Sequence, residues 1–115
     1  MKTMKLDTLV SSLSLSCVVG DMPSDFNGVY AGDFLSRAMS HVEADNLWIT
    51  IMSNVNVIAV ASLTDAKAVV LAENVELAPD AKAAAEEKGI TVLSSPLSVY
   101  EICGILYAAD LSEKG

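Results

Sequence analysis

The sequence predicts an α/β fold with three layers, in which a mainly parallel sheet of four to five strands carries helices on both faces. Short β-branched apolar segments alternate with helix-forming segments along the chain, and this alternation predicts right-handed crossovers between parallel strands. The predicted strands are short and apolar, which is typical of a sheet covered on each face. A chain of 115 residues has the size of one domain, so we expect residues 1–115 to form a single domain.

The N-terminal part is expected to hold a helix, a strand and a long turn. The helix is predicted over residues 5–13, where apolar residues recur at spacings of three and four: Leu6, Leu9, Val10 and Leu13. The strand covers residues 15–19. Residues 20–28 are rich in Gly, Pro, Asp and Asn and are therefore predicted to form a turn. This turn does not match a calcium loop, because Phe26 and Gly32 stand where that motif needs Gly and Glu.

The middle of the chain is expected to hold a helix, a strand and a second helix. The first helix covers residues 33–42, with Asp33 as its N-cap and an inner face of Leu35, Ala38, Met39 and Val42. Residues 47–51 form an apolar strand. The second helix covers residues 55–63 and follows an N-cap at Ser53 or Asn54.

The uncharged segment 46–64 has nearly the length of a membrane span. Polar side chains occupy its centre, where they would be costly in a bilayer: Ser53, Asn54 and Asn56. We therefore interpret the segment as a buried strand followed by a buried helix.

The C-terminal half is expected to continue the alternation. A strand at residues 67–71 precedes a helix at residues 79–88, which is rich in Ala, Glu and Lys and ends at Gly89. A further strand covers residues 90–93.

The final helix is expected to begin with Ser95 as N-cap and Pro96 at the first helical position. Its apolar stripe is wider than one core face needs and is formed by Leu97, Val99, Tyr100, Ile102, Cys103, Ile105, Leu106 and Tyr107. Because contiguous exposed apolar surface usually marks an interface, this stripe suggests self-association.

Charge excludes nucleic acid and anionic membranes as expected partners. The formal net charge is −8, and the few basic residues are scattered along the chain: Lys2, Lys5, Arg37, Lys67, Lys82, Lys88 and Lys114. An acidic chain without a basic cluster repels a polyanion.

No continuous apolar run follows the N-terminal lysines, so no signal peptide is expected.

The two cysteines, Cys17 and Cys103, lie in apolar contexts and are expected to be buried, reduced thiols in a reducing cytoplasm. They are too far apart in sequence for a zinc motif, so no metal site is expected.

Catalytic motifs do not appear in the sequence. It contains no P-loop, no GxGxxG, no HExxH and no GxSxG. His41 is the only histidine, and we expect it on the surface near a helix C-terminus. An enzyme would have to use His41 or a carboxylate among Asp21, Asp25 and Asp33. We therefore expect no catalytic residues and no cofactor.

The best candidate for a ligand site is the turn that holds Ser53, Asn54 and Asn56. It follows a predicted parallel strand and opens a helix, which is where open α/β sheets bind ligands and where free N–H groups attract anions. We include Gly32 and Asp33, next to the preceding helix, among the candidate ligand residues. Simple helix capping by the same residues is the alternative interpretation.

The combined pattern resembles the DRTGG domain family over residues 19–106. The resemblance is carried by GDMPSDFNGVYAGDFLSRAM at residues 20–39, LWIT at 47–50, and KAVVLAENVELAPDAKAAAEEKGITVLSSPLSVYEICGIL at 67–106. The segment GDFLS is also similar to the N-terminal domain of HPr kinase and to the first domain of some Mur ligases. At the two parts of the naming signature this chain has Ser53-Asn54 in place of Asp-Arg and Ala72-Glu73-Asn74 around the position of Gly-Gly.

The resemblance implies a small regulatory module, of the kind found in phosphotransacetylases, between CBS domains of some pyrophosphatases, and as stand-alone proteins. It implies a non-catalytic module that acts as a homodimer or binds a partner protein. The alternative is a sensor that binds an anionic metabolite or nucleotide at the turn 53–56. The catalytic P-loop domain of HPr kinase has no counterpart in this sequence.

Overall fold

The structure, a computed structural model, describes residues 3–114, and the side chains up to residue 112. Its elements follow one another in the order β1 (Met4–Lys5), α1 (Val10–Leu13), β2 (Ser16–Val19), β3 (Asp25–Phe26), β4 (Val29–Ala31), α2 (Leu35–His41), β5 (Leu47–Thr50), α3 (Val55–Thr64), β6 (Ala68–Leu71), α4 (Pro79–Lys88), β7 (Val92–Ser94) and α5 (Val99–Lys114).

Within residues 3–114, five strands form the main sheet in the order β2-β7-β6-β5-β4. The neighbours β4–β5, β5–β6 and β6–β7 are parallel, and β2 closes the sheet by pairing antiparallel with β7. Separately, β1 and β3 form a short antiparallel pair. The predicted mainly parallel α/β sheet is therefore confirmed.

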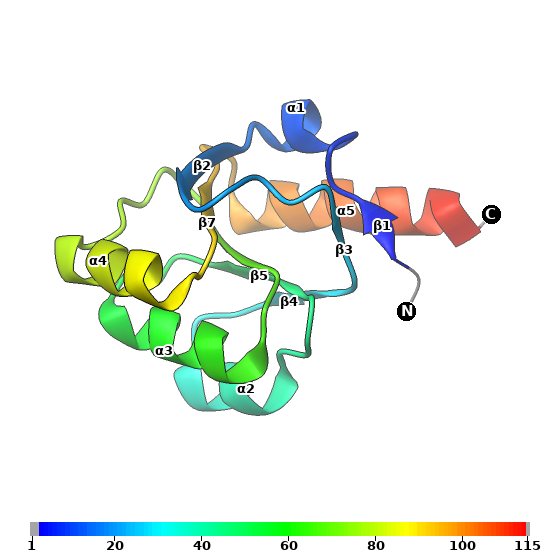
Figure 1. Cartoon of the computed structure of the whole chain (residues 1–115). Coiled ribbons are helices and arrows are strands. Elements are labelled where there is room, and N and C mark those ends of the chain that lie inside the picture. The colour runs from blue at the N-terminus through cyan, green and yellow to red at the C-terminus, as the bar shows by residue number, and fades with distance from the viewer. Residues whose placement is uncertain (1–2, 115) are drawn as a thin grey trace.

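Helices cover both faces of the main sheet (Figure 1), which confirms the predicted three layers. On one face, α2, α3 and α4 pack around Trp48, Val69 and Leu71. On the other face, α1 and α5 pack around Ile49 and Val70. Because successive side chains of a strand point to opposite faces, a strand covered on both faces must be apolar throughout. This explains why all four residues of β5 and all four of β6 are buried.

The uncharged segment 46–64 folds as predicted, with β5 followed by α3. Asn54 is the N-cap of α3, and its side chain accepts a hydrogen bond from the backbone N–H of Asn56. Among the described residues, no helix combines the length and the apolar character that a membrane crossing requires. The helix Pro79–Lys88 and its end at Gly89, which has a φ of 70°, are also confirmed.

The predicted N-terminal helix over residues 5–13 is wrong in its first half. Only Val10–Leu13 is helical, and Met4–Lys5 forms β1, paired with β3. Leu6 and Leu13 are nevertheless buried in the same core. The leucines recur at helical spacing because they point into one core, although this part of the chain forms a strand and a turn as well as a helix.

The predicted turn 20–28 is also incomplete, because it contains β3 and is followed directly by the unpredicted edge strand β4. The chain crosses Gly28, whose φ is 86°, between these two strands. Short strands next to glycines carry a weak sequence signal, since Gly disfavours strand interiors.

Two predicted helix caps are wrong. Phe34, not Asp33, is the N-cap residue of α2, and α5 begins at Val99 rather than after Ser95. Ser98 caps α5: its hydroxyl accepts from the N–H of Glu101 at 3.1 Å, and the Glu101 carboxylate accepts from the N–H of Ser98 at 3.0 Å. This reciprocal pair is a capping box.

Two burial predictions also fail. Met39 is 52% exposed, although it was expected on the inner face of α2. Cys17 is exposed, whereas Cys103 is half-buried, and both thiols are free. Burial raises the pKa of both thiols, and at Cys17 the nearby Asp21 carboxylate raises the pKa further.

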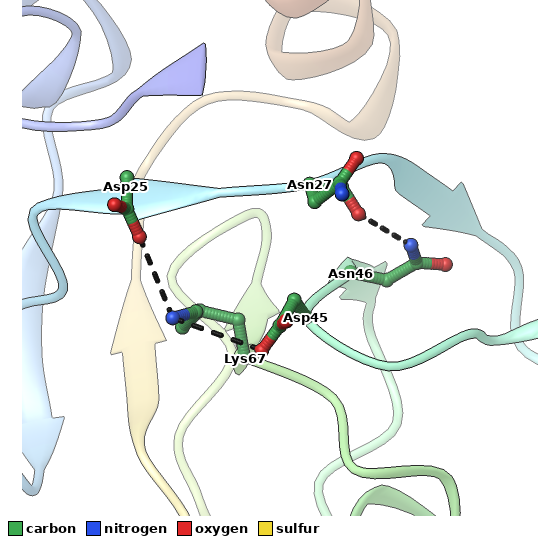
Figure 2. Close-up of polar contacts among 5 residues, drawn as sticks. All are labelled: Asp25, Asn27, Asp45, Asn46 and Lys67. Carbon is green, nitrogen blue, oxygen red and sulfur yellow. Dashed lines mark hydrogen bonds and ion pairs between the residues drawn. The ribbon is translucent and has the colours of Figure 1, made fainter. Parts of the chain in front are cut away.

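Polar contacts fasten the amino ends of the central strands (Figure 2). The Lys67 ammonium lies 3.5 Å from the Asp25 carboxylate and 3.7 Å from the Asp45 carboxylate. The Asn46 side chain donates a 2.7 Å hydrogen bond to the backbone carbonyl of Asn27. These contacts tie the β1–β3 pair to the main sheet. The parallel strands end at the opposite edge, and open α/β sheets bind ligands at that edge.

Candidate functional site

The predicted site residues lie at the carboxyl edge of the main sheet. Gly32 and Asp33 follow β4, and Ser53 and Asn54 follow β5. Backbone hydrogen bonds connect these strand ends: Gly32 N–H donates to Ile49 O at 3.1 Å, and Ala72 N–H donates to Thr50 O at 3.1 Å. Parallel pairing thus brings the segments after β4, β5 and β6 together at one edge.

Asp33 uses its carboxylate to join the ends of β4 and β5. Its Oδ1 atom accepts a hydrogen bond from the hydroxyl of Thr50 at 2.7 Å and from the backbone N–H of Ile51 at 3.0 Å. Thr50 is fully buried, so its hydroxyl needs this partner. Gly32 contributes its carbonyl, which accepts from the indole N–H of Trp48 at 3.0 Å. Both residues therefore hold the edge together.

The turn before α3 has a structural role as well. Asn54 Oδ1 accepts from the N–H of Asn56 at 3.0 Å, which satisfies one of the free donors of the helix. The Ser53 carbonyl accepts from the N–H of Ala78 at 3.1 Å and so joins the start of α3 to the start of α4. The capping interpretation of Asn54 is thus confirmed, and the first turn of α3 still opens at the carboxyl edge.

The loop after β6 shows a feature that the sequence alone did not reveal. Glu73 and Asn74 have φ values of 60° and 57°, in the left-handed region that glycine adopts most easily. Their N–H groups donate to Leu97 O at 2.9 Å and Ser95 O at 3.0 Å. This loop is the segment where the resemblance to the DRTGG family leads one to expect glycines, and the chain adopts a left-handed backbone there with Glu73 and Asn74.

A cavity of about 570 Å³ opens beside this loop, at the ends of β6 and β7. It is lined by polar residues that the sequence analysis did not select, among them Asn74, Glu76, Lys82 and Ser94. Their position after parallel strands and in the first turn of α4 was the available signal. The carboxylates of Asp33, Glu73 and Glu76 and the ammonium of Lys82 lie along this edge. The edge therefore offers both hydrogen-bond donors and acceptors to a ligand.

Of the residues considered for catalysis, Asp33 lies at this edge, whereas His41 and Asp25 lie apart from it. His41 is exposed at the end of α2, where its Nδ1 lies 2.9 Å from the carbonyl oxygen of Arg37. Its ring stacks on that of Tyr30, with the two ring centroids 6.0 Å apart. Asp25 pairs with Lys67 at the opposite edge. In the part of the chain that the structure describes, no group of three or more His, Cys, Asp or Glu side chains could hold a metal ion.

A second candidate surface lies on the outer face of α5. The α5 stripe is formed by Tyr100, Gly104, Tyr107 and Leu111, and the side chains of the two tyrosines and the leucine are 87%, 65% and 50% exposed. Beside it, an apolar groove of about 450 Å³ lies between α5 and the edge strand β4, lined by Val29, Ala31, Cys103, Leu106 and Tyr107 together with Met4 and Asp110. The last helix therefore carries exposed apolar surface, as its sequence predicted.

No family model and no curated protein matches the chain. A solved structure does match: the crystal structure of the CBS and DRTGG domains of the regulatory region of Clostridium perfringens pyrophosphatase, complexed with the activator diadenosine tetraphosphate. The match has a TM-score of 0.69 and 13% sequence identity. The chain shares a fold with this regulatory region. The match covers 86% of this chain, which spans 44% of the length of the other.

The likeness to a region that contains DRTGG domains supports the expected resemblance at the level of the fold. The α/β fold of this chain is what the two structures share. At 13% identity the comparison carries no residue of a binding site from one chain to the other.

Proposed function

We propose that this chain is a non-catalytic regulatory module that works as a homodimer. The observation that carries the proposal is the α5 stripe, where Tyr100, Tyr107 and Leu111 project exposed apolar surface from one helix. Clustered exposed aromatic residues are typical of protein interfaces. The shared fold with the regulatory region of a pyrophosphatase supports the regulatory role.

The setting proposed for this module is the reducing cytoplasm, where the free thiols Cys17 and Cys103 remain unpaired. Nucleic acid and membrane lipid are not among the proposed partners, because the net charge of −8 opposes binding to polyanions.

Sedimentation equilibrium of the full chain, from low micromolar to hundreds of micromolar, tests the homodimer. We expect a reversible monomer–dimer equilibrium with a dimer mass at the upper concentrations. A single monomer mass across the whole range would contradict the proposal. Repeating the run at high salt separates apolar association, which persists, from charge-driven association, which salt screens.

A second candidate function is the sensing of a small anionic metabolite or nucleotide at the carboxyl edge. The specific observation in its favour is that Gly32, Asp33, Ser53, Asn54 and Asn56 all reach this edge, next to the N-terminus of the ten-residue helix α3. The pyrophosphatase regulatory region of similar fold was crystallised with a nucleotide activator.

Thermal-shift measurements with ATP, diadenosine tetraphosphate and inorganic phosphate test this candidate. A ligand at one hundred times its dissociation constant should stabilise the fold by roughly 2.7 kcal/mol. Asn54→Ala should abolish the shift, whereas Asn27→Ala, at the opposite edge of the sheet, should leave it unchanged. Equal stability with and without every ligand would rule out these three as ligands of the edge.

A further inference from the structure

The α5 stripe has a spacing that is unchanged when the helix is reversed. Its residues, Tyr100, Gly104, Tyr107 and Leu111, follow one another at intervals of four, three and four. These intervals keep them on one line of an α-helix. In two antiparallel copies of α5, Tyr100 of one therefore lies level with Leu111 of the other, and Gly104 lies level with Tyr107. A two-fold interface requires this kind of self-complementarity.

Gly104 supplies an open notch in the middle of the stripe. A Cβ atom built on Gly104 would meet no heavy atom of the described residues within 4 Å, its own helix backbone aside. The missing side chain is therefore not required by packing inside the protomer. A glycine inside a helix costs stability, which a close contact with a second helix would explain. The bulky Tyr107 of a second copy has the size to cover this notch.

Charge and area also fit a second copy. The stripe itself is uncharged. Of the carboxylates on the same helix, that of Glu101 accepts a hydrogen bond from the N–H of Ser98, and Asp110 is only 6% exposed. A tyrosine buries about 150–250 Å², so the four tyrosines of a dimer supply at most about 600–1,000 Å² of the roughly 1,200–2,000 Å² that a stable interface needs. The apolar groove between α5 and β4 lies beside the stripe and extends this surface.

We propose that two copies of this chain associate through an antiparallel pair of α5 helices, with Tyr107 of each copy packed over Gly104 of the other. This inference rests on the homodimer proposed above and names its interface. The pair is isologous, so one surface on each protomer is enough to close the dimer.

The variant Gly104→Leu tests the notch. It fills space that is open in the protomer and replaces a helix-breaking residue, so the fold should be kept and its thermal midpoint should not fall. We expect the dimer dissociation constant to rise at least tenfold in sedimentation equilibrium. Ala83→Leu is the matched control, because it adds the same side chain to the exposed face of α4, and it should leave the constant unchanged.

Disulfide trapping tests the antiparallel arrangement. In a background of Cys17→Ser and Cys103→Ser, the double variant Tyr100→Cys/Leu111→Cys should form a covalent dimer under mild oxidation. Either single variant should not, because an antiparallel pair separates the two copies of residue 100 by about 16 Å along the helix. Covalent dimers from the single variants would indicate a parallel pair and overturn the inference.

The outcomes separate the two proposals. If the wild-type chain is a dimer and Gly104→Leu dimerises equally well, the α5 interface is wrong and the homodimer stands. If the wild-type chain is a monomer at all concentrations, the homodimer itself is wrong and the α5 stripe faces another partner.

Discussion

The hydroxyl of Thr50 donates a 2.7 Å hydrogen bond to the carboxylate of Asp33 and so ties the end of β5 to the end of β4. The same carboxylate oxygen accepts from the N–H of Ile51 at 3.0 Å. One exposed side chain thus satisfies two donors on the neighbouring strand, at the edge where a ligand site is proposed.

Removing this carboxylate should destabilise the fold. We expect Asp33→Ala to lower the free energy of unfolding by about 1–2 kcal/mol, because it leaves the buried Thr50 hydroxyl without its charged partner. Urea denaturation followed by circular dichroism measures the change. Asp33→Asn, which keeps an acceptor oxygen, should lose less, and Asp7→Ala on the exposed N-terminal turn should lose almost nothing. A loss in Asp7→Ala equal to that in Asp33→Ala would show a general charge effect instead.

The two serines near the start of α5 should differ in their contribution to stability. Ser95 is fully buried, and its hydroxyl donates to Leu13 O at 2.7 Å while accepting from the N–H of Leu97 at 3.1 Å. Ser95→Ala should cost about 2–3 kcal/mol, in the upper part of the range for such changes, since it leaves two buried groups without partners. Ser98→Ala should cost about 1 kcal/mol, as expected for an N-cap. Equal losses, measured by thermal unfolding, would contradict the buried role of Ser95.

Glycine should be favoured at Glu73 and Asn74. A left-handed backbone costs a residue with a Cβ about 1 kcal/mol or more, so Glu73→Gly should raise the free energy of unfolding by about 1 kcal/mol. Glu76→Gly, in the same loop but without a positive φ, should not stabilise the fold. Chemical denaturation of the three proteins compares them directly. A destabilised Glu73→Gly would mean that its side chain makes a contact that outweighs the backbone strain.

The thiol of Cys17 should alkylate slowly at neutral pH despite its exposure. Burial and the Asp21 carboxylate both raise the pKa of Cys17, so the reactive thiolate is scarce until the pH exceeds the ordinary thiol pKa. Asp21→Asn should lower the pKa and speed the reaction with iodoacetamide at mildly alkaline pH, whereas Asp7→Asn should not. Mass spectrometry of the modified peptides measures both rates.

The same shift has a consequence for stability. Because the folded state raises the pKa of both thiols, their contribution to stability is complete below the ordinary thiol pKa. It is lost as the pH rises through the raised values.

Local patterns were enough to predict the parts of the fold that depend on neighbours in sequence. The cap at Asn54, the end of α4 at Gly89 and the apolar strands β5 and β6 follow from residue type and spacing within a few positions. Residues 55–63 have a composition that also suits a strand, and the N-cap signal before them correctly indicated the helix that is observed as Val55–Thr64.

Contacts over long separations explain the failures. Asp33 has the residue type of an N-cap, but its carboxylate finds better donors on β5, and Phe34 takes the cap position. Ser95 precedes a proline and is typical of a cap, yet its hydroxyl reaches the carbonyl of Leu13. In the candidate site, the turn 53–56 was predicted to follow a parallel strand and to open a helix, whereas the cavity near Asn74 and Lys82 depends on the conformation of the loop after β6, which was not predicted.

The antiparallel pairing of β2 with β7 also determines the order in which the chain can fold during synthesis. Ser16 pairs with Ser94, so β2 leaves the ribosome long before the strand that it joins. The unit from β4 to β6 pairs neighbouring strands through short crossovers and can form first. The nascent N-terminal segment must therefore wait, with Leu13 and Leu15 still unburied, until β7 and α5 emerge to cover them. Until then these leucines are exposed apolar surface, through which unfinished chains tend to aggregate.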